Sequence, residues 1–315
     1  IITLELPEGG IFMSIRTRRA KGNAEVIIDN ELCNLCGLCV NVCKGKPLYI
    51  ENDRLHVDQS ILFGCIGCGQ CAAVCPQKCI VIEGREISAK DIIDLPPRDQ
   101  RANYEQLQAL LLGRRSIRDF KNQEVEAEVI QKILDAVSTA PMGLPPSEVQ
   151  VLILQGFDRV REFAQDMVEV FKRKKWWFSP AALGIMRPFI GKETYDLMKT
   201  FVAPLPDFFI KTMAKGEDWL LYNAPLAMYF HASPTSDPLD CTIAGTYAML
   251  AAESLGLGTC MIGSIAPFLK SKNPVSTKYG IPTENNQGIM IIFGYPKYKY
   301  TRSIKRSLGG VTYYR

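Results

Sequence analysis

The sequence predicts a two-domain α+β protein, in which a small duplicated cysteine-rich domain precedes a larger domain of mixed helices and strands. Two cysteine runs of identical spacing lie thirty-two residues apart in the first quarter of the chain. The 315 residues exceed an average domain of ~150 residues. Beyond residue 100, helical periodicity alternates with short apolar runs of strand length. We expect a tail over residues 1–22, the cysteine-rich domain over 23–88, a linker over 89–104 and the larger domain over 105–315.

Composition and charge exclude several classes of protein. Apolar residues make up 47% of the chain and charged residues 22%, the balance of an ordinary globular protein. A net charge of +4 without a long Lys/Arg block gives no electrostatic support for a nucleic-acid partner. The uncharged stretch 219–236 is interrupted by prolines and falls short of a bilayer span of ~20 apolar residues. The N-terminus lacks a signal-peptide pattern, so we expect a cytoplasmic location; Met13 is a candidate first residue, and residues 1–12 receive no function.

Each cysteine run has the spacing C-x2-C-x2-C-x3-C. The first contains Cys33, Cys36, Cys39 and Cys43, and the second contains Cys65, Cys68, Cys71 and Cys75. This spacing is typical of bacterial two-cluster ferredoxins, in which three thiolates of a run bind one [4Fe-4S] cluster and the fourth binds the other. We therefore predict two [4Fe-4S] clusters, one held by Cys33, Cys36, Cys39 and Cys75, and the other by Cys65, Cys68, Cys71 and Cys43.

The repeat extends past the cysteines, because residues 48–51 (LYIE) recur as 80–83 (IVIE) at the same offset. We interpret the unit as a duplicated loop, helical turn and short strand, too small to be stable by apolar burial alone. A pair of zinc sites is the alternative, although zinc does not need a third thiol every three residues. Lys44 stands where Pro76 follows the second run. Cys79, Cys241 and Cys260 lie outside the pattern and are interpreted as packing residues.

After residue 88 the chain becomes polar and carries the Pro96-Pro97 pair, which indicates a linker. Helices are then predicted over 105–112, around 129–137 and over about 240–255. Strands are predicted at the apolar runs 149–154, 226–230 and 289–293.

Three polar segments of the larger domain are candidates for one binding site. In "RRSIRDF", Arg114, Arg115, Ser116 and Arg118 match a phosphate, although a solvated basic turn has the same composition. In "APMGLPP", residues 140–146, proline and glycine let a flat ligand approach the backbone, as an ordinary loop would also allow. The third, "GLGTCMIGS" at 256–264, is a glycine-rich turn without a known nucleotide-binding spacing.

Together, the three segments resemble the FMN-dependent nitroreductase family, in the branch with an N-terminal two-cluster ferredoxin-like domain. The resemblance covers residue 23 to the C-terminus and implies a ferredoxin-like domain followed by a nitroreductase-type α+β flavin domain. It implies that FMN is held by Arg114, Arg115, Ser116 and Arg118, by Pro141, Met142 and Gly143, by Met261, Ile262 and Gly263, and by Arg306, with Arg302 and Lys305 as weaker candidates. Residues 144–148 depart from the family pattern.

The resemblance also implies a homodimer with FMN at the subunit interface. Electrons from a ferredoxin-type donor would pass singly through the clusters to FMN, which converts single electrons into pairs. The acceptor would be a small electrophile such as a nitroaromatic, quinone or activated alkene, with no catalytic acid or base assigned. The alternatives are an electron-transfer module serving a protein partner, and an enzyme that attacks flavin or a halogenated aromatic. The insertion-like stretch 171–214 is expected to pack over the flavin pocket or the partner subunit rather than on a membrane surface.

Overall fold

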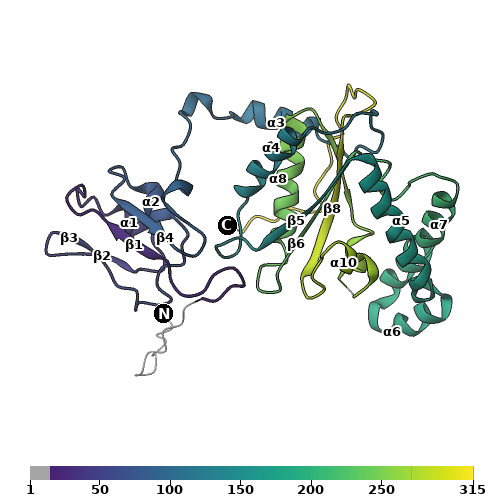
Figure 1. The fold of residues 1–315 in the computed structure, drawn as a ribbon, viewed down its shortest axis with the longest axis horizontal. Helices are drawn as coiled ribbons and strands as arrows, with labels where there is room; N and C mark the ends of the chain where they lie inside the picture. The colour runs from purple at the N-terminus through teal and green to yellow at the C-terminus, as the bar shows by residue number, and fades with distance from the viewer. Residues whose placement is uncertain (1–14, 271, 315) are drawn as a thin grey trace. The chain divides into compact units, whose positions relative to one another are not determined.

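A computed structural model describes residues 15–270 and 272–314, and these form two compact units (Figure 1). The first unit contains residues 15–101 and two short segments from later in the chain, Met142–Glu148 and Thr235–Asp237. The second contains the other described residues. Most of the predicted N-terminal tail, residues 1–14, lies outside the described residues. None of the described helices combines the length and the apolar character needed to cross a membrane.

The first unit consists of two copies of one pattern, a cysteine-bearing loop followed by a short helix and a strand. Its elements are β1 (Glu25–Ile28), α1 (Leu38–Val42), β2 (Leu48–Glu51), β3 (Arg54–Val57), α2 (Gln70–Val74), β4 (Ile80–Glu83), η1 (Ala89–Asp91) and η2 (Arg98–Gln100). Strand β1 pairs with β4 and β2 pairs with β3, both antiparallel. The helices α1 and α2 pack against each other.

The sequence repeat is also a repeat of backbone conformation. Gly37 and Gly69 precede the two helices with φ of 73° and 72°, in the left-handed region that glycine adopts without strain. In one half the amide of Asp29 donates to the carbonyl of Cys79 at 2.9 Å, and in the other the amide of Asp58 donates to the carbonyl of Pro47 at 2.7 Å. Cys79 and Pro47 therefore occupy equivalent positions in the two halves.

The interior of the first unit is small. Its buried core residues are Ala24, Cys39, Leu48, Leu55, Cys71, Ala72, Cys79, Ile80 and Ile82. Three of these are cysteines, and most of the others are short or branched side chains of modest area. Apolar burial on this scale contributes little to folding in a unit of this size.

A buried arginine joins four separate stretches of the first unit. Arg85 is only 6% exposed, and its guanidinium donates to four carbonyl oxygens. The acceptors are the carbonyls of Ile66 at 3.1 Å, Ile15 at 2.7 Å, Gly22 at 2.8 Å and Pro145 at 2.9 Å. The last of these bonds connects the cysteine-rich chain to the segment Met142–Glu148.

A buried carboxylate of the segment Met142–Glu148 also bonds to the N-terminal part of the first unit. Glu148 is 4% exposed and accepts hydrogen bonds from the amides of Arg18, at 2.5 Å, and Arg19, at 3.4 Å. Its other oxygen accepts from the hydroxyl of Thr235 at 2.9 Å. These bonds explain why Met142–Glu148 and Thr235–Asp237 belong to the first unit although their neighbours in sequence belong to the second.

The second unit is built around a four-stranded antiparallel sheet of order β5-β6-β8-β7. Its elements are α3 (Tyr104–Gly113), α4 (Ala127–Ser138), β5 (Val149–Gln155), α5 (Phe157–Lys174), η3 (Lys175–Phe178), α6 (Pro180–Leu197), η4 (Met198–Val202), α7 (Leu205–Ala214), β6 (Leu226–Ala232), α8 (Asp240–Ser254), β7 (Gly258–Ile262), α9 (Ala266–Leu269), α10 (Pro274–Lys278) and β8 (Asn286–Gly294). The predicted strands and helices are confirmed at these positions.

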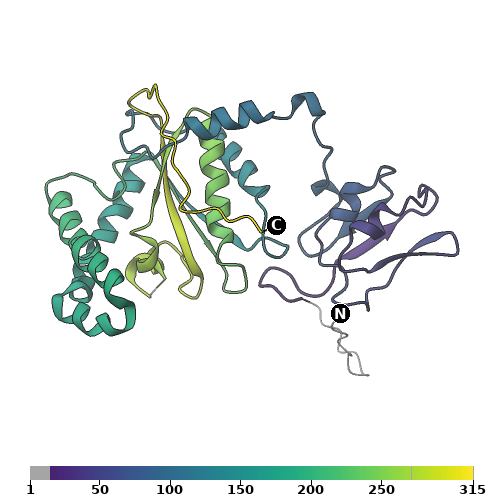
Figure 2. The ribbon, with the colours of Figure 1, turned by 180° about the vertical axis from the view of Figure 1, so that it is seen from behind.

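Helices cover both faces of this sheet (Figures 1 and 2). Alternate residues of β6 and β8 point to opposite cores: Met228 and Ile291 pack with α4 and α8, whereas Tyr229 and Ile292 pack with α5 and α9. Because both faces are buried, these strands have continuous apolar sequences. A Cβ at Gly245 of α8 would lie 2.8 Å from Ile291, so glycine allows the close approach of this helix to the sheet.

The insertion-like stretch 171–214 contains the end of α5, then η3, a kinked helix α6, η4 and α7, instead of one continuous helix. Helix α6 contains Pro188, and Gly191 has a non-helical φ of 75°, which kinks it. A π-helical segment, η4, and then α7 follow. Trp176, Phe189 and Phe201 of this stretch are exposed.

We expect Arg85→Met to loosen the first unit without affecting the second, because it removes charge-assisted bonds to four partly buried carbonyls. A loss of about 2 kcal/mol, or roughly thirtyfold in amide protection, should appear by hydrogen exchange in peptides covering residues 15–30 and 80–87. Arg101→Met is the matched control, since Arg101 is exposed and donates to a single carbonyl, that of Pro96. Equal protection in the two variants would contradict the role assigned to Arg85.

Candidate functional site

The eight cysteines of the two runs lie on or next to the short helices α1 and α2. Cys39 is the second residue of α1 and Cys71 the second residue of α2, so three thiols of each run lie at or before a helix start. Cys43 and Cys75 are the C-cap residues of the same helices. The third and fourth cysteines of each run are four residues apart, which corresponds to ~6 Å along the helix axis.

The thiols line two cavities, and each cavity takes cysteines from both runs. Cys33, Cys36, Cys39 and Cys75 line the first cavity together with Cys79. Cys65, Cys68, Cys71 and Cys43 line the second cavity together with Pro47. The fourth cysteine of each run is thus grouped with the three loop cysteines of the other run.

The chemistry of the two thiol sets fits iron–sulfur clusters, which are held by four cysteine thiolates each. Across residues 15–270 and 272–314, no group of three or more His, Cys, Asp or Glu side chains is placed to hold a single metal ion. Burial raises the pKa of the Cys71 thiol to about 12 and also raises the pKa of Cys39 and Cys65. Since a metal binds the thiolate, loading of these sites releases protons.

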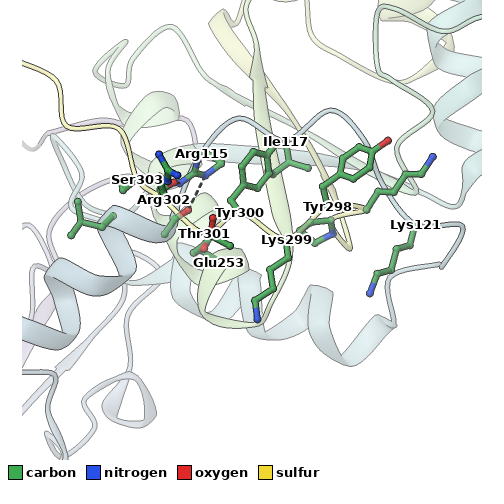
Figure 3. A pocket seen from close by; sticks show the side chains of 14 residues that line it. Arg115, Ile117, Lys121, Glu253, Tyr298, Lys299, Tyr300, Thr301, Arg302 and Ser303 are labelled. Carbon is green, nitrogen blue, oxygen red and sulfur yellow. Dashed lines mark hydrogen bonds between the residues drawn. The ribbon is translucent and has the colours of Figure 1, made fainter.

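The second unit contains a pocket of about 560 Å³ between the end of α3 and the chain that follows β8 (Figure 3). It is lined by Leu112, Gly113, Arg115, Ile117, Lys121, Glu253, Pro296, Lys297, Tyr298, Lys299, Tyr300, Thr301, Arg302 and Ser303. Five of these side chains are cationic and one is acidic. The pocket therefore favours an anionic ligand.

Arg115 is fixed within this pocket by two contacts. Its guanidinium lies 4.4 Å from the centre of the Tyr300 ring and donates to the carbonyl of Arg302 at 2.7 Å (Figure 3). Glu253 of α8 faces the same end of the pocket. Burial raises the pKa of Glu253, while the charges of Arg114 and Arg115 act to lower it.

The structure brings two of the three predicted segments together. Ser116 forms an isolated parallel bridge with Thr259, and the amide of Ile117 donates to the Thr259 carbonyl at 2.8 Å. The segment that begins at Arg114 therefore runs beside β7, which ends with Met261 and Ile262. Met261 is 37% exposed and Ile262 is buried, and Gly263 follows in a turn.

The other predicted residues lie as follows. Arg114 caps the C-terminus of α3, and the Arg118 guanidinium lies 5.7 Å from the Tyr222 ring. Pro141 is the last residue of its stretch in the second unit, whereas Met142 and Gly143 belong to the segment that packs with the first unit. Arg306 is exposed and does not line the pocket, in contrast to Arg302.

Several residues of these sites were not predicted from the sequence. Lys121 and the alternating Lys297, Tyr298, Lys299 and Tyr300 line the pocket. The alternation of basic and aromatic residues directly after an apolar strand was the available signal. Cys79 was interpreted as a packing residue, and it is buried, but its thiol also lies against the first set of cysteines.

Comparison with protein families gives two matches. The chain belongs to the nitroreductase family, whose model matches residues 111–295, more than half of the 315 residues. A 4Fe-4S dicluster domain matches residues 25–76. The predicted family, fold class and oxidoreductase character are thereby confirmed. A comparison with curated proteins gives no match.

The chain is also similar to solved structures of nitroreductases and of a BluB-like flavoprotein. A nitroreductase with bound FMN from Bacteroides fragilis is 18% identical, with 68% of this chain and all of that chain covered and a TM-score of 0.49. One from Desulfitobacterium hafniense with bound FMN is 21% identical over 66% and 97% of the two chains, with a TM-score of 0.45. A BluB-like flavoprotein from Clostridium difficile is 19% identical over 64% and 94%, with a TM-score of 0.45.

Proposed function

We propose that this chain is an iron–sulfur flavoprotein oxidoreductase that carries two [4Fe-4S] clusters and FMN. It takes single electrons from a ferredoxin-type donor and passes them to FMN for the reduction of a small electrophilic acceptor, such as a nitroaromatic, a quinone or an activated alkene. When bound, FMN supplies the conversion between one-electron and two-electron chemistry. We further propose that the protein works as a homodimer in the cytoplasm.

The observation that carries this proposal is the division of eight thiols into two sets of four. Each set lines one cavity and draws three cysteines from one run and one from the other. This is the arrangement that the ligand spacing of two-cluster ferredoxins requires. Cys36 and Cys68 are exposed at the edges of the two sites, which gives an external donor access to both.

The basic pocket of the second unit supports the FMN assignment. A phosphate is matched by arginine forks, and Arg115 is already oriented by Tyr300 and by the Arg302 carbonyl. Arg114, Ser116 and Arg118 lie on the same segment. We propose that these residues, with Pro141, Met142, Gly143, Met261, Ile262, Gly263 and Arg306, contact the flavin nucleotide.

The exposed C-terminal segment supports the homodimer. Residues 297–314 have no regular secondary structure, and Tyr298, Ile304, Leu308 and Tyr313 along this segment are all more than half exposed. Exposed apolar side chains in a row are typical of a surface that a partner covers. A second copy of this chain is the partner that we propose.

The cluster wiring predicts how paired cysteine substitutions combine. Cys75→Ser with Cys33→Ser should remove one cluster, about half of the iron, because both cysteines serve the first site. Cys75→Ser with Cys65→Ser should remove both clusters. Iron analysis and electron paramagnetic resonance of the anaerobically purified variants would measure this, with Cys241→Ser as the control. The reverse pattern would show that each run binds its own cluster.

Removal of the phosphate contacts should weaken FMN retention selectively. Arg114→Ala and Arg115→Ala should each lower FMN affinity roughly ten- to a hundredfold, since charge-assisted bonds contribute ~1.5–3 kcal/mol each. Affinity for riboflavin, which lacks the phosphate, should change little. Arg159→Ala is the control, because Arg159 is an exposed arginine of the same unit outside the pocket. Equal losses for FMN and riboflavin would contradict a phosphate role.

Reduction should proceed through the clusters. We expect reduced ferredoxin to reduce the bound flavin rapidly under anaerobic conditions and NADH or NADPH to reduce it slowly. Cys65→Ser should abolish the ferredoxin-driven rate but leave acceptor turnover intact after the flavin is reduced chemically. Steady turnover of small acceptors distinguishes an enzyme from a module that serves a protein partner. A nicotinamide-driven rate equal to full turnover, unchanged in Cys65→Ser, would exclude the proposed route.

A further inference from the structure

The first thiol site contains a fifth cysteine that the ligand pattern does not use. Cys79 is 4% exposed and lines the same cavity as Cys33, Cys36, Cys39 and Cys75. Its sulfur lies 3.4 Å from that of Cys75, within hydrogen-bond distance for sulfur. The Cys33 thiol is a second neighbour of the same group.

The second site offers a comparison inside the same molecule. Pro47 occupies the position equivalent to Cys79, because it lies thirty-two residues earlier, lines the second cavity and accepts the equivalent backbone hydrogen bond. Proline has neither a thiol nor an amide N–H. The Cys79 amide donates to the Cys75 sulfur, and the Cys79 thiol lies within hydrogen-bond distance of it, whereas Pro47 can supply neither kind of donor to Cys43. The two halves thus differ in the hydrogen-bond donors beside Cys75 and Cys43, the cysteines that line the cavity of the other run.

We propose that Cys79 is a positioning residue whose S–H donates to the Cys75 sulfur and makes the first cluster easier to reduce than the second. This inference rests on the proposed function, in which Cys75 is a thiolate ligand. A thiolate has no proton to give, so the thiol of Cys79 is the donor of the 3.4 Å contact.

The physical reason is electrostatic. Reduction by one electron from the ferredoxin-type donor makes the first site one charge unit more negative, and no bond forms or breaks. A hydrogen bond to a ligand sulfur stabilises the more negative state, and such bonds are among the factors that set cluster potentials. Burial of Cys79 strengthens the effect, because a hydrogen bond is electrostatically stronger in a low dielectric.

The test is an anaerobic redox titration of the loaded protein followed by electron paramagnetic resonance. Cys79→Ala should make one of the two one-electron steps less favourable by roughly tenfold in its equilibrium constant, or about 59 mV, and leave the other step unchanged. Cys79→Ser, which keeps an O–H donor, should shift that step less than Cys79→Ala does. Cys241→Ala removes a buried cysteine of the second unit that lines neither cavity and should shift neither step.

The reciprocal variant tests the same idea in the other half. Pro47→Cys places a thiol beside Cys43 and should make the other step more favourable. Full iron content in Cys79→Ala with both steps unshifted would overturn the inference while leaving the two-cluster proposal intact. Loss of half the iron in Cys79→Ala would also overturn it, by showing that Cys79 is a ligand. Absence of iron from the wild-type protein would overturn the proposed function itself.

Discussion

The first unit has cysteine thiols in its core, where a larger domain would have apolar side chains. Three of its nine core residues are cysteines, and the remaining thiols of the two runs line the two cavities. Small domains bury a limited apolar surface and often add cross-links or metal to reach a stable fold. Since the groups proposed to hold the clusters include residues of this core, cluster binding would be coupled to the folding of the unit.

Because the first unit is a duplication, the positions at which its two halves differ show how the surroundings of the two thiol sites differ. The two halves share ligand spacing, left-handed glycines before the helices and one backbone hydrogen bond, so their common features follow from a single local fold. The two halves differ at equivalent positions, where Cys79 corresponds to Pro47 and Pro76 corresponds to Lys44. The buried Arg85 is a further difference. Arg85 has its guanidinium on the carbonyl of Ile66, next to Cys65 in sequence, and so places a positive charge on the side of the second site. Two sites with the same ligands are thus given different surroundings.

Much of this arrangement could be predicted from sequence because the signals were local. The cysteine spacing predicts the two groups of thiols that line the two cavities, and β6 and β8 are continuous apolar runs because helices cover both faces of their sheet. The grouping of Met142–Glu148 with the first unit could not be predicted. It depends on bonds from Arg85, Arg18 and Arg19, which lie 60 to 130 residues away in sequence. The Lys-Tyr alternation at 297–300 was visible, but only the fold shows that it faces Arg115.

The path of the chain limits how freely its parts could be exchanged with those of relatives. The backbone passes from one unit to the other five times, not once at the linker near residue 100. A graft that replaced residues 1–101 alone would leave the Pro145 carbonyl without the Arg85 guanidinium, and Glu148 would lose the amides of Arg18 and Arg19. Because the first unit also contains Met142–Glu148 and Thr235–Asp237, an exchange that keeps these hydrogen bonds would have to carry those two segments along with residues 1–101.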